Sequence, residues 1–399
     1  MNLLFLLPAA LANGQTTHMW ISQEAIEVLP EGELRDFLSE PSHLAALKNG
    51  TMFPDGGYAV DHPYGETAHW EPFQGLFRDW ILDNFEGPMD PEAGASVAFY
   101  LGMASHGMAD QVFDSLYMER SKQMDAEQGW ALGESLDTSS DIVWASITGK
   151  QTPPPAWYPP VLVSLFEEVG IEVSEETLTT GQNRLGLAID LVGNLGTNPE
   201  GVQVHADLFP WGCANLHDRS VPGAPYSEAQ IIADYWTALW NELKDESVPL
   251  EVLASFPSNG GMDHHRASEE VESRLTLVFN RSLLKSEVSE IQYAITSESE
   301  TPELEPWLFY NNDSHVVHLI PQSDWSENSD YQLELTAGLT ATDGRVLIEN
   351  ELVNFSTKPL LDPADAECTC STNPKAGSFH YAIGLIGLTA LRRKRIKRS

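Results

Sequence analysis

Basic residues are scarce in this chain of 399 residues. It has 22 lysines and arginines against 59 aspartates and glutamates, which gives a formal net charge of -37 at pH 7. Six of those 22 cations lie within residues 392–399, so the rest of the chain is more acidic still. Such a surface repels polyanions, and this argues against nucleic acid as a partner. Adaptation to a saline habitat is an alternative reason for the same acidity.

Cysteine is nearly absent. Cys213 stands alone, and Cys368 and Cys370 are separated by a single threonine. Three residues so placed cannot build a disulfide framework, which excludes the class of small disulfide-stapled secreted domains. The fold therefore depends on hydrophobic cores, and the chain is long enough for two domains.

Long apolar runs are missing from the interior of the sequence and occur only near its two ends. Residues 1–12 are predicted to be a short signal peptide that ends in Ala10-x-Ala12, although a basic n-region is lacking. Residues 359–375 are polar and are interpreted as a linker. Residues 376–399 combine a mostly apolar segment with a basic tail, which predicts a marginal transmembrane helix whose positive end stays cytoplasmic. We therefore expect export, followed by attachment at the cell surface or outer envelope, or by secretion after C-terminal processing.

Helical periodicity dominates residues 13–248. In residues 18–29 the apolar side chains fall on one stripe, as in an amphipathic helix. The sequence Ser227-Glu-Ala-Gln230 is typical of a capping box and predicts the start of another helix. Two proline clusters, at residues 153–155 and 159–160, predict a loop.

The period changes to two in residues 250–358. Leu275, Leu277 and Phe279 alternate with other residues, and the same spacing recurs at residues 291–295 and 331–335. Asp343-Gly344 is a strong hairpin signal. Several short strands at this spacing indicate a β-sandwich, so the fold class we expect is multidomain: an all-α domain followed by an all-β sandwich.

The segment Phe99–Asp114 contains three side chains of the kind that bind metals. His106, Asp110 and Asp114 are four residues apart, so on a helix they would project from one face with a drift of about 40° per step. An imidazole and two carboxylates are costly to bury in an apolar helix unless a cation satisfies them, and zinc suits that need. The alternative is one buried histidine that is hydrogen-bonded to one aspartate.

Further candidate ligands stand in four other segments, each bounded by aromatic or apolar residues. These candidates are His18, Asp55, His69, Asp137 and Asp141. Three histidines and several carboxylates can together hold two or three divalent ions, because imidazole nitrogen and carboxylate oxygen are both good zinc donors.

Four of these segments carry a resemblance to a known family. The stretches Thr17–Leu29, Asn49–Asp55, Ala68–Trp70 and Phe99–Asp110 resemble the zinc-dependent phospholipase C family. Within it, the spacing through Asp141 is most similar to the catalytic domain of the glycosylphosphatidylinositol-specific phospholipases D. The resemblance covers about residues 13–245. It implies an all-α, phospholipase C/nuclease-like fold around a trinuclear zinc site.

The resemblance also implies which residues hold the ions. His18 would share one zinc with the mature N-terminal residue, which is Asn13 if cleavage follows Ala12. The second zinc would be bound by four side chains, and one of these, Asp110, would bridge two ions. Those four are Asp55, His69, His106 and Asp110.

The third ion would lie at Asp114 with the Asp137 and Asp141 region. Here the sequence departs from the family, which usually has a histidine at the position of Asp114 and another at that of Gly133. The third zinc would then be weakly bound, absent, or replaced by a harder ion such as calcium or magnesium, which carboxylates favour.

The activity implied is phosphodiester hydrolysis by a zinc-activated water. Asp55 would double as a general base, or would only bind metal. Trp20, Tyr58 and Trp70 would line a head-group pocket, with core packing as the alternative for at least two of them. We expect an exported phosphodiesterase that acts on phospholipid or glycosylated inositol lipid. The alternatives are a single-strand nuclease of the same fold and a catalytically weakened cell-surface adhesion protein.

The sandwich and the tail resemble other known modules. Leu275–Ser282 and Tyr331–Thr340 are similar to bacterial immunoglobulin-like domains, for which a spacer or adhesion role is the expectation. The histidines of this region are interpreted as structural or exposed. They are His264, His265, His315 and His318. Cys368-Thr-Cys370 before the apolar segment resembles a bacterial surface-sorting signal.

Overall fold

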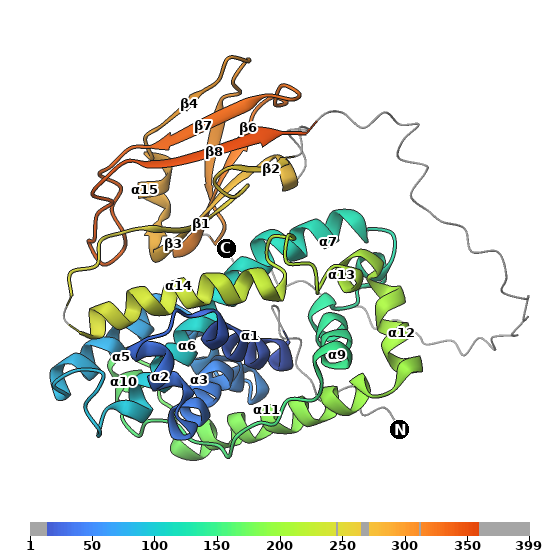
Figure 1. Ribbon diagram of the computed structural model, residues 1–399. Coiled ribbons are helices and arrows are strands. Elements are labelled where there is room, and N and C mark those ends of the chain that lie inside the picture. The colour runs from blue at the N-terminus through green and yellow to red at the C-terminus, as the bar shows by residue number, and fades with distance from the viewer. Residues whose placement is uncertain (1–13, 245, 265–270, 311–312, 359–399) are drawn as a thin grey trace, which may run out of the picture. The chain divides into compact units, whose positions relative to one another are not determined.

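The computed structural model describes residues 14–358, apart from 245, 265–270 and 311–312 (Figure 1). The signal peptide, Asn13, His265, the linker and the sorting signal predicted from the sequence lie outside the described residues. Among the helices that are described, none is both long and apolar enough to cross a membrane.

The first part of the chain is helical, as the sequence predicts. Its elements are α1 (Gln15–Val28), α2 (Glu33–Ser39), α3 (Pro41–Ala59), α4 (Tyr64–Ala68), α5 (Glu71–Asn84), α6 (Gly94–Val112), the π-helical segment η2 (Phe113–Met118), α7 (Glu119–Met124), α8 (Gly129–Leu132), α9 (Leu136–Thr148), α10 (Leu162–Glu168), α11 (Glu175–Gly196), α12 (Pro199–Leu208), α13 (Pro210–Ala214) and α14 (Pro225–Leu243). The proline clusters lie in an irregular stretch before α10, as expected.

The predicted start of α14 was wrong by three residues, because the capping box placed the N-cap at Ser227 and the N-cap is Ala224. The helix begins at Pro225, with Ala224 in extended conformation as its N-cap and no side-chain cap bond. Proline is favoured in the first turn because it has no N–H to leave unpaired and its φ is already helical. Ser227 therefore lies inside the first turn and does not cap the helix.

Helices α3 and α6 pack closely because glycines remove side chains from their contact. A Cβ on Gly50 would lie 2.0 Å from the carbonyl oxygen of Phe99, and one on Gly102 would lie 2.1 Å from that of Leu47. Only glycine permits backbones to approach this closely. The two helices carry Asp55, His106 and Asp110, three of the four candidate ligands of the second zinc, so this contact determines how far apart those three lie.

The second part of the chain is an immunoglobulin-like β-sandwich. Its elements are β1 (Val252–Phe256), β2 (Gly261–His264), the 3₁₀ turn η3 (Val271–Ser273), β3 (Leu275–Leu284), α15 (Lys285–Ser289), β4 (Tyr293–Thr296), β5 (Leu304–Leu308), β6 (Asp313–Pro321), β7 (Asp330–Leu335) and β8 (Glu351–Thr357). One sheet has the order β1-β3-β6-β5 and the other β2-β8-β7-β4. The pairing is antiparallel except between β2 and β8.

Strands β3 and β6 are buried on both faces. Leu277 and Val317 belong to the core of the sandwich, whereas Val278 and Val316 belong to the core of the helical part. The first sheet is therefore shared between the two cores, and the described residues form one compact unit.

Candidate metal centre

Three short stretches of chain bring four buried donor groups together. His106 and Asp110 lie one turn apart on α6, Asp55 lies in the last turns of α3, and His69 is the residue that ends α4. All four are less than a tenth exposed. They are the four residues that the resemblance implies for the second zinc.

The distances between the donor atoms fit a zinc ion. His69 Nε2 lies 3.0 Å from His106 Nε2, 3.4 Å from Asp55 Oδ1 and 3.5 Å from Asp110 Oδ2. His106 Nε2 lies 3.6 Å from Asp55 Oδ1 and 3.4 Å from Asp110 Oδ2. Tetrahedral ligands at about 2.0–2.1 Å from zinc lie about 3.3 Å from one another. The five distances bracket that value.

Hydrogen bonds to backbone carbonyl groups fix the orientation of both imidazoles. His69 Nδ1 lies 2.6 Å from the carbonyl oxygen of Gly65, and His106 Nδ1 lies 2.7 Å from that of Thr51. A carbonyl only accepts hydrogen bonds, so each Nδ1 carries the proton and each Nε2 of the neutral ring presents a lone pair. Two lone pairs 3.0 Å apart, beside two carboxylates, require a cation between them, either a proton or a metal.

Asp110 is placed to bridge two ions. Its Oδ2 faces His69 and His106, whereas its Oδ1 lies 2.9 Å from His18 Nε2. His18 comes from the first turn of α1, and its ring stacks on that of His106 with 4.0 Å between centroids. Donor atoms of His18, His106 and Asp110 lie close enough together to share one ion, as do those of Asp55, His69 and His106. The bridging role expected for Asp110 stays a prediction.

The charges in the cluster are strongly interdependent. Burial raises the pKa of Asp110 to about 6. Burial also raises the pKa of Asp55, but the charge of His106 and hydrogen bonds from both histidines outweigh it and hold that pKa well below its usual range. For His69, burial lowers the pKa, and the contacts with Asp55 and Asp110 more than reverse this and raise it to about 9. A cation at the centre is thus favoured at neutral pH.

Asp114 lies outside the regular helix on which it was expected. Helix α6 ends at Val112, and Asp114 belongs to η2. Burial and the nearby charge of Asp110 raise the pKa of Asp114 well above its usual value. A π turn holds more residues than an α turn, so it reduces the drift expected between Asp110 and Asp114. Segments of this kind occur often at functional sites.

Asp137 lies in the first turn of α9 and faces the same acidic region. Burial raises its pKa well above the usual value, and the charge of Asp114 adds to this. Asp114 Oδ1 and Asp137 Oδ1 are both buried and accept no hydrogen bond from the described residues. Among the described residues, neither aspartate belongs to a group of three donors close enough together to hold an ion, so the third ion expected here stays a prediction.

The structure places Asp141 differently from our expectation of a metal ligand. Its carboxylate accepts hydrogen bonds from the backbone N–H groups and hydroxyls of both Thr16 and Thr17. These amides are unpaired donors at the start of α1, so Asp141 caps that helix from α9. A Cβ on Gly14, the N-cap residue, would lie 2.1 Å from Asp141 Cγ, which explains the glycine.

A pocket of about 180 Å³ opens beside the cluster. It is lined by Asp55, Tyr58, Glu66, His69, Trp70, Gly107, Asp110, Asp114 and Tyr310. Tyr58 and Trp70, expected to line a head-group pocket, are among them. Trp20 is not, because it packs edge-on against Trp144 and Tyr226 at 4.7 and 4.8 Å.

The sequence analysis did not identify several residues that form hydrogen bonds around the centre. The side-chain amide of Gln15 donates to Asp55 Oδ2, and that of Gln74 donates to the carbonyl oxygen of His69 at 2.9 Å. Glu66 Oε1 and Oε2 accept from Trp70 Nε1 at 2.8 Å and Tyr58 Oη at 2.6 Å. Burial raises the pKa of Glu66, but these two hydrogen bonds outweigh it and lower that pKa, so Glu66 is an anion.

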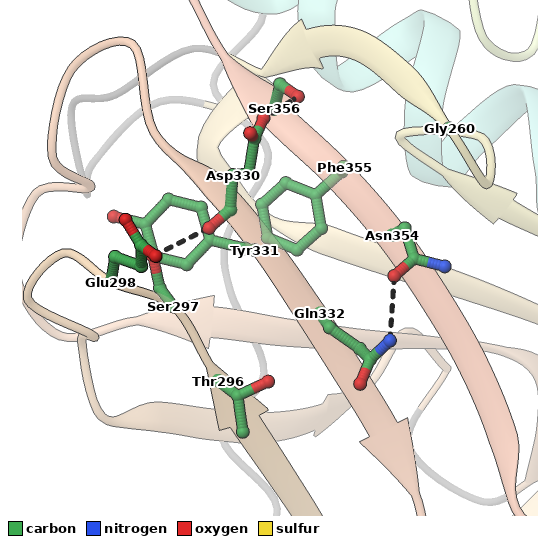
Figure 2. A pocket seen from close by; sticks show the side chains of 10 residues that line it. All are labelled: Gly260, Thr296, Ser297, Glu298, Asp330, Tyr331, Gln332, Asn354, Phe355 and Ser356. Atoms are coloured by element: carbon green, nitrogen blue, oxygen red, sulfur yellow. Dashed lines mark hydrogen bonds between the residues drawn. The ribbon is translucent and has the colours of Figure 1, made fainter.

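A second cavity, of about 440 Å³, lies on the sandwich (Figure 2). Its polar side chains bond to one another: Gln332 Nε2 donates to Asn354 Oδ1 at 2.9 Å, and Ser356 Oγ donates to Asp330 Oδ1 at 2.5 Å. No histidine or cysteine lines it.

Comparison with known proteins supports both predicted resemblances. Residues 17–113 match the family of zinc dependent phospholipases C, and residues 246–357 match the bacterial Ig-like domain. The first match contains His18, Asp55, His69, His106 and Asp110. The class defined by fold and site is thus a helical, zinc phospholipase C-like centre followed by an immunoglobulin-like sandwich.

Individual relatives are similar over less than a third of the chain. The chain is 31% identical to phosphatidylinositol-glycan-specific phospholipase D of Rattus norvegicus over 128 residues, which are 30% of this chain. It is 32% identical to the Homo sapiens protein of that name over 117 residues, 27% of this chain. The matched region spans only 15% and 14% of the length of those curated relatives.

Among solved structures, the chain is similar to surface layer protein SbsC, domains 1–6. The alignment covers 82% of this chain and 46% of the SbsC chain, at 10% sequence identity. Its TM-score of 0.22 is too low to indicate a shared fold.

Proposed function

We propose that this protein is a zinc-dependent phosphodiesterase that hydrolyses a phospholipid or a glycosylated inositol lipid. The observation that carries the proposal is the convergence of two oriented imidazoles and two carboxylates at distances suited to zinc. The match of residues 17–113 to zinc dependent phospholipases C supports the chemistry. The similar curated proteins support the lipid class, because their name specifies a phosphatidylinositol-glycan substrate.

Bound zinc would lower the pKa of a coordinated water toward neutrality and offset the negative charge of the phosphodiester. Asp55, His69, His106 and Asp110 would hold one ion, and His18 with Asp110 a second, to which Asn13 is proposed to contribute. Gln15 and Gln74 restrain Asp55 and His69, so the donor set is preorganised. Asp55 lines the pocket as an anion and is also proposed to accept a proton from the attacking water.

The pocket has room for the phosphate and the groups next to it, but not for a whole lipid. Its volume is about 180 Å³, so acyl chains would extend outside. Glu66, which is held by hydrogen bonds from Tyr58 and Trp70, adds a further negative charge to the pocket wall formed by the aspartates. Such a wall disfavours further anionic groups and favours a neutral polyol or a cationic head group, in agreement with the charge argument against nucleic acid.

We also propose that the protein is exported and that its C-terminal segment associates with the cell envelope. The support is the sequence itself, namely the apolar start with Ala10-x-Ala12 and the apolar segment followed by basic residues. N-terminal sequencing of the protein recovered from cells tests this, with Asn13 as the expected first residue. Recovery of the intact start from the cytoplasm would contradict it.

The test of the activity joins metal analysis to a substrate panel. Protein depleted of metal and then reloaded with zinc is assayed on phosphatidylcholine, on phosphatidylinositol, on a glycosylphosphatidylinositol-anchored protein and on single-stranded DNA. We expect zinc-dependent cleavage of at least one lipid and none of DNA. Products identify the bond cut, since diacylglycerol and phosphatidic acid mark opposite sides of the phosphate.

The same assay separates the alternatives. Cleavage of DNA without cleavage of lipid would replace the proposal with a nuclease of the same fold. Zinc bound in stoichiometric amount without any hydrolysis would favour the adhesion protein with a structural metal. Absence of bound zinc together with absence of hydrolysis would refute the metal centre itself.

A further inference from the structure

A tyrosine of the immunoglobulin-like part lines the metal pocket. Tyr310 follows β5 and precedes β6, within the residues that match the bacterial Ig-like domain and far outside those that match the phospholipases. Its hydroxyl donates to Asp114 Oδ2 at 2.7 Å. Its ring meets Trp70 edge-on, with 5.0 Å between centroids. The pocket beside Asp55, His69 and Asp110 is thus bounded by residues from both parts of the chain.

The strand that follows Tyr310 is bonded to the helix that carries the ligands. Gln111, the neighbour of Asp110 on α6, accepts hydrogen bonds at its side-chain oxygen from Ser314 Oγ at 2.9 Å and from His315 N at 2.8 Å. Both donors belong to β6. The position of Tyr310 is therefore linked to α6 through buried polar contacts.

A second set of contacts joins the sandwich to the chain beside Trp70, the residue that the Tyr310 ring meets. Arg281 of β3 is fully buried, and its Nε lies 3.4 Å from Glu71 Oε1. Ser282 N donates to Glu71 Oε2 at 2.6 Å. Glu71 follows Trp70 in sequence and begins α5, so the sandwich also holds the chain next to the indole that Tyr310 contacts.

We propose that Tyr310 is a positioning residue for the metal centre, and that the immunoglobulin-like part completes this centre rather than serving only as a spacer. The hydroxyl binds one oxygen of Asp114, which leaves Oδ1, buried and without a hydrogen bond from the described residues, to face the acidic cluster. A hydrogen bond to the outer oxygen of a carboxylate fixes the direction in which its inner oxygen can bind a cation. The inference rests on the proposed metal site and assigns Tyr310 to its third, weakest ion.

A conservative substitution isolates the hydroxyl. Tyr310→Phe keeps the ring against Trp70 and removes only the donor to Asp114. The matched control is Tyr293→Phe on β4, which removes a hydroxyl that donates to the carbonyl oxygen of Leu304 at 2.7 Å, inside the sandwich. Zinc alone is the probe, titrated into the metal-depleted full chain in competition with a chelator, so that each ion's dissociation constant is measured without reference to activity.

We expect Tyr310→Phe to weaken the loosest zinc by about 10–100-fold, the usual effect of losing such an outer hydrogen bond. The tighter ions should keep their affinity, and Tyr293→Phe should bind all ions like the wild type. Equal zinc binding by the two variants would overturn the proposal. If the wild type binds zinc and hydrolyses lipid but Tyr310→Phe is unaffected, only this inference fails, whereas a wild type without zinc removes the proposed function as well.

A double substitution tests whether Tyr310 affects zinc binding through Asp114. If Tyr310 acts through Asp114, then adding Tyr310→Phe to Asp114→Asn should cause no further loss of zinc affinity. Losses of zinc affinity that multiply would show that Tyr310 acts independently and would overturn the positioning role.

Enzyme kinetics give a further test. The ratio of kcat to KM should follow zinc occupancy, and saturating zinc should restore kcat in Tyr310→Phe. A kcat that stays low at full occupancy would also contradict it.

Discussion

At the scale of residues, the centre depends on the direction of two imidazoles. The sequence identified His69 and His106 as ligand candidates, because a resemblance links them to a zinc family and their neighbours are apolar. It did not reveal the carbonyl groups of Gly65 and Thr51 that fix their Nε2 atoms. Backbone acceptors have no signature in a sequence.

Other residues were not predictable for a related reason. Gln15, Glu66 and Gln74 contact the centre through side chains that occur in any soluble protein, and their roles follow only from which segments meet in space. The assignment of Asp141 failed for the same reason, because its four-residue spacing from Asp137 resembled a ligand pair whereas its contacts are with the start of α1.

His106→Ala should remove the metal centre. Its ring contributes to both groups of residues able to hold an ion, so we expect the loss of at least one zinc per chain and a fall in activity of at least about 100-fold. Metal analysis and lipid hydrolysis measure both. His318→Ala, a buried histidine whose Nδ1 pairs with Thr276 Oγ1 in the sandwich, is the control and should keep its zinc. Full zinc content in His106→Ala would refute the assignment.

Zinc affinity should rise with pH. In the metal-free protein the raised pKa of His69, about 9, means that at neutral pH this ring carries a proton that zinc must displace. Apparent affinity should therefore increase about tenfold per unit of pH up to about 9 and then level off. Below about 6, protonation of Asp110 should make the dependence steeper. Competition titrations from pH 5.5 to about 9.5 test this, and a flat profile between 7 and 9 would contradict it.

At the scale of elements, the sequence predicted strands with one buried face better than strands with two. Residues 291–295 and 331–335, which alternate, correspond to β4 and β7, and each of these strands has one face more buried than the other. Strands β3 and β6 are buried on both faces along nearly their whole length, so apolar residues occur on both faces and alternation is a poorer guide to them. The sequence analysis found the start of β3 through Leu275 and Leu277 but did not identify β6, which contacts the metal-bearing helix.

Gly102→Ala should disturb the contact between α3 and α6. The new Cβ would lie 2.1 Å from the carbonyl oxygen of Leu47 and 2.8 Å from Thr51 N, so the helices must separate. We expect a loss of about 1–3 kcal/mol in the free energy of unfolding, as for other overpacked cores. Zinc affinity should fall as well, because the displaced Thr51 orients His106.

Gly75→Ala on α5 is the matched control for that change. The nearest atom to its new Cβ is Arg78 Nη2 at 3.9 Å, an ordinary contact. Alanine is the better helix former, so this variant should gain about 0.5–1 kcal/mol and keep its zinc. Chemical denaturation gives both values. Equal stability of the two variants would mean that the glycine contact does not constrain the helices.

At the scale of the whole molecule, the two parts share a core and a buried charge network. From the sequence we expected the sandwich to have a separate spacer or adhesion role, because its alternating pattern is complete in itself. Its attachment to the helical part depends on Arg281, whose guanidinium pairs with Glu242 of α14 and Glu71 of α5. Nothing in the sequence around a single arginine shows that it will be fully buried.

Arg281→Ala should destabilise the entire described unit. The substitution leaves Glu71 and Glu242 buried with weaker compensation, and breaking a buried ion pair from one side costs about 3–5 kcal/mol. We expect thermal unfolding to remain a single transition at a lower temperature, because Val278 and Val316 join the two cores. Arg35→Ala, which breaks the exposed pair with Glu27, should cost less than about 1 kcal/mol. Two separate transitions would show that the parts unfold independently.

Anomalous diffraction at the zinc absorption edge, from crystals of the zinc-loaded full chain, tests the central claim most directly. We predict a zinc peak about 2.0–2.2 Å from Asp55 Oδ1, His69 Nε2, His106 Nε2 and Asp110 Oδ2. A second peak should lie between His18 Nε2 and Asp110 Oδ1. Zinc found only at other positions, in protein that hydrolyses lipid, would contradict the account.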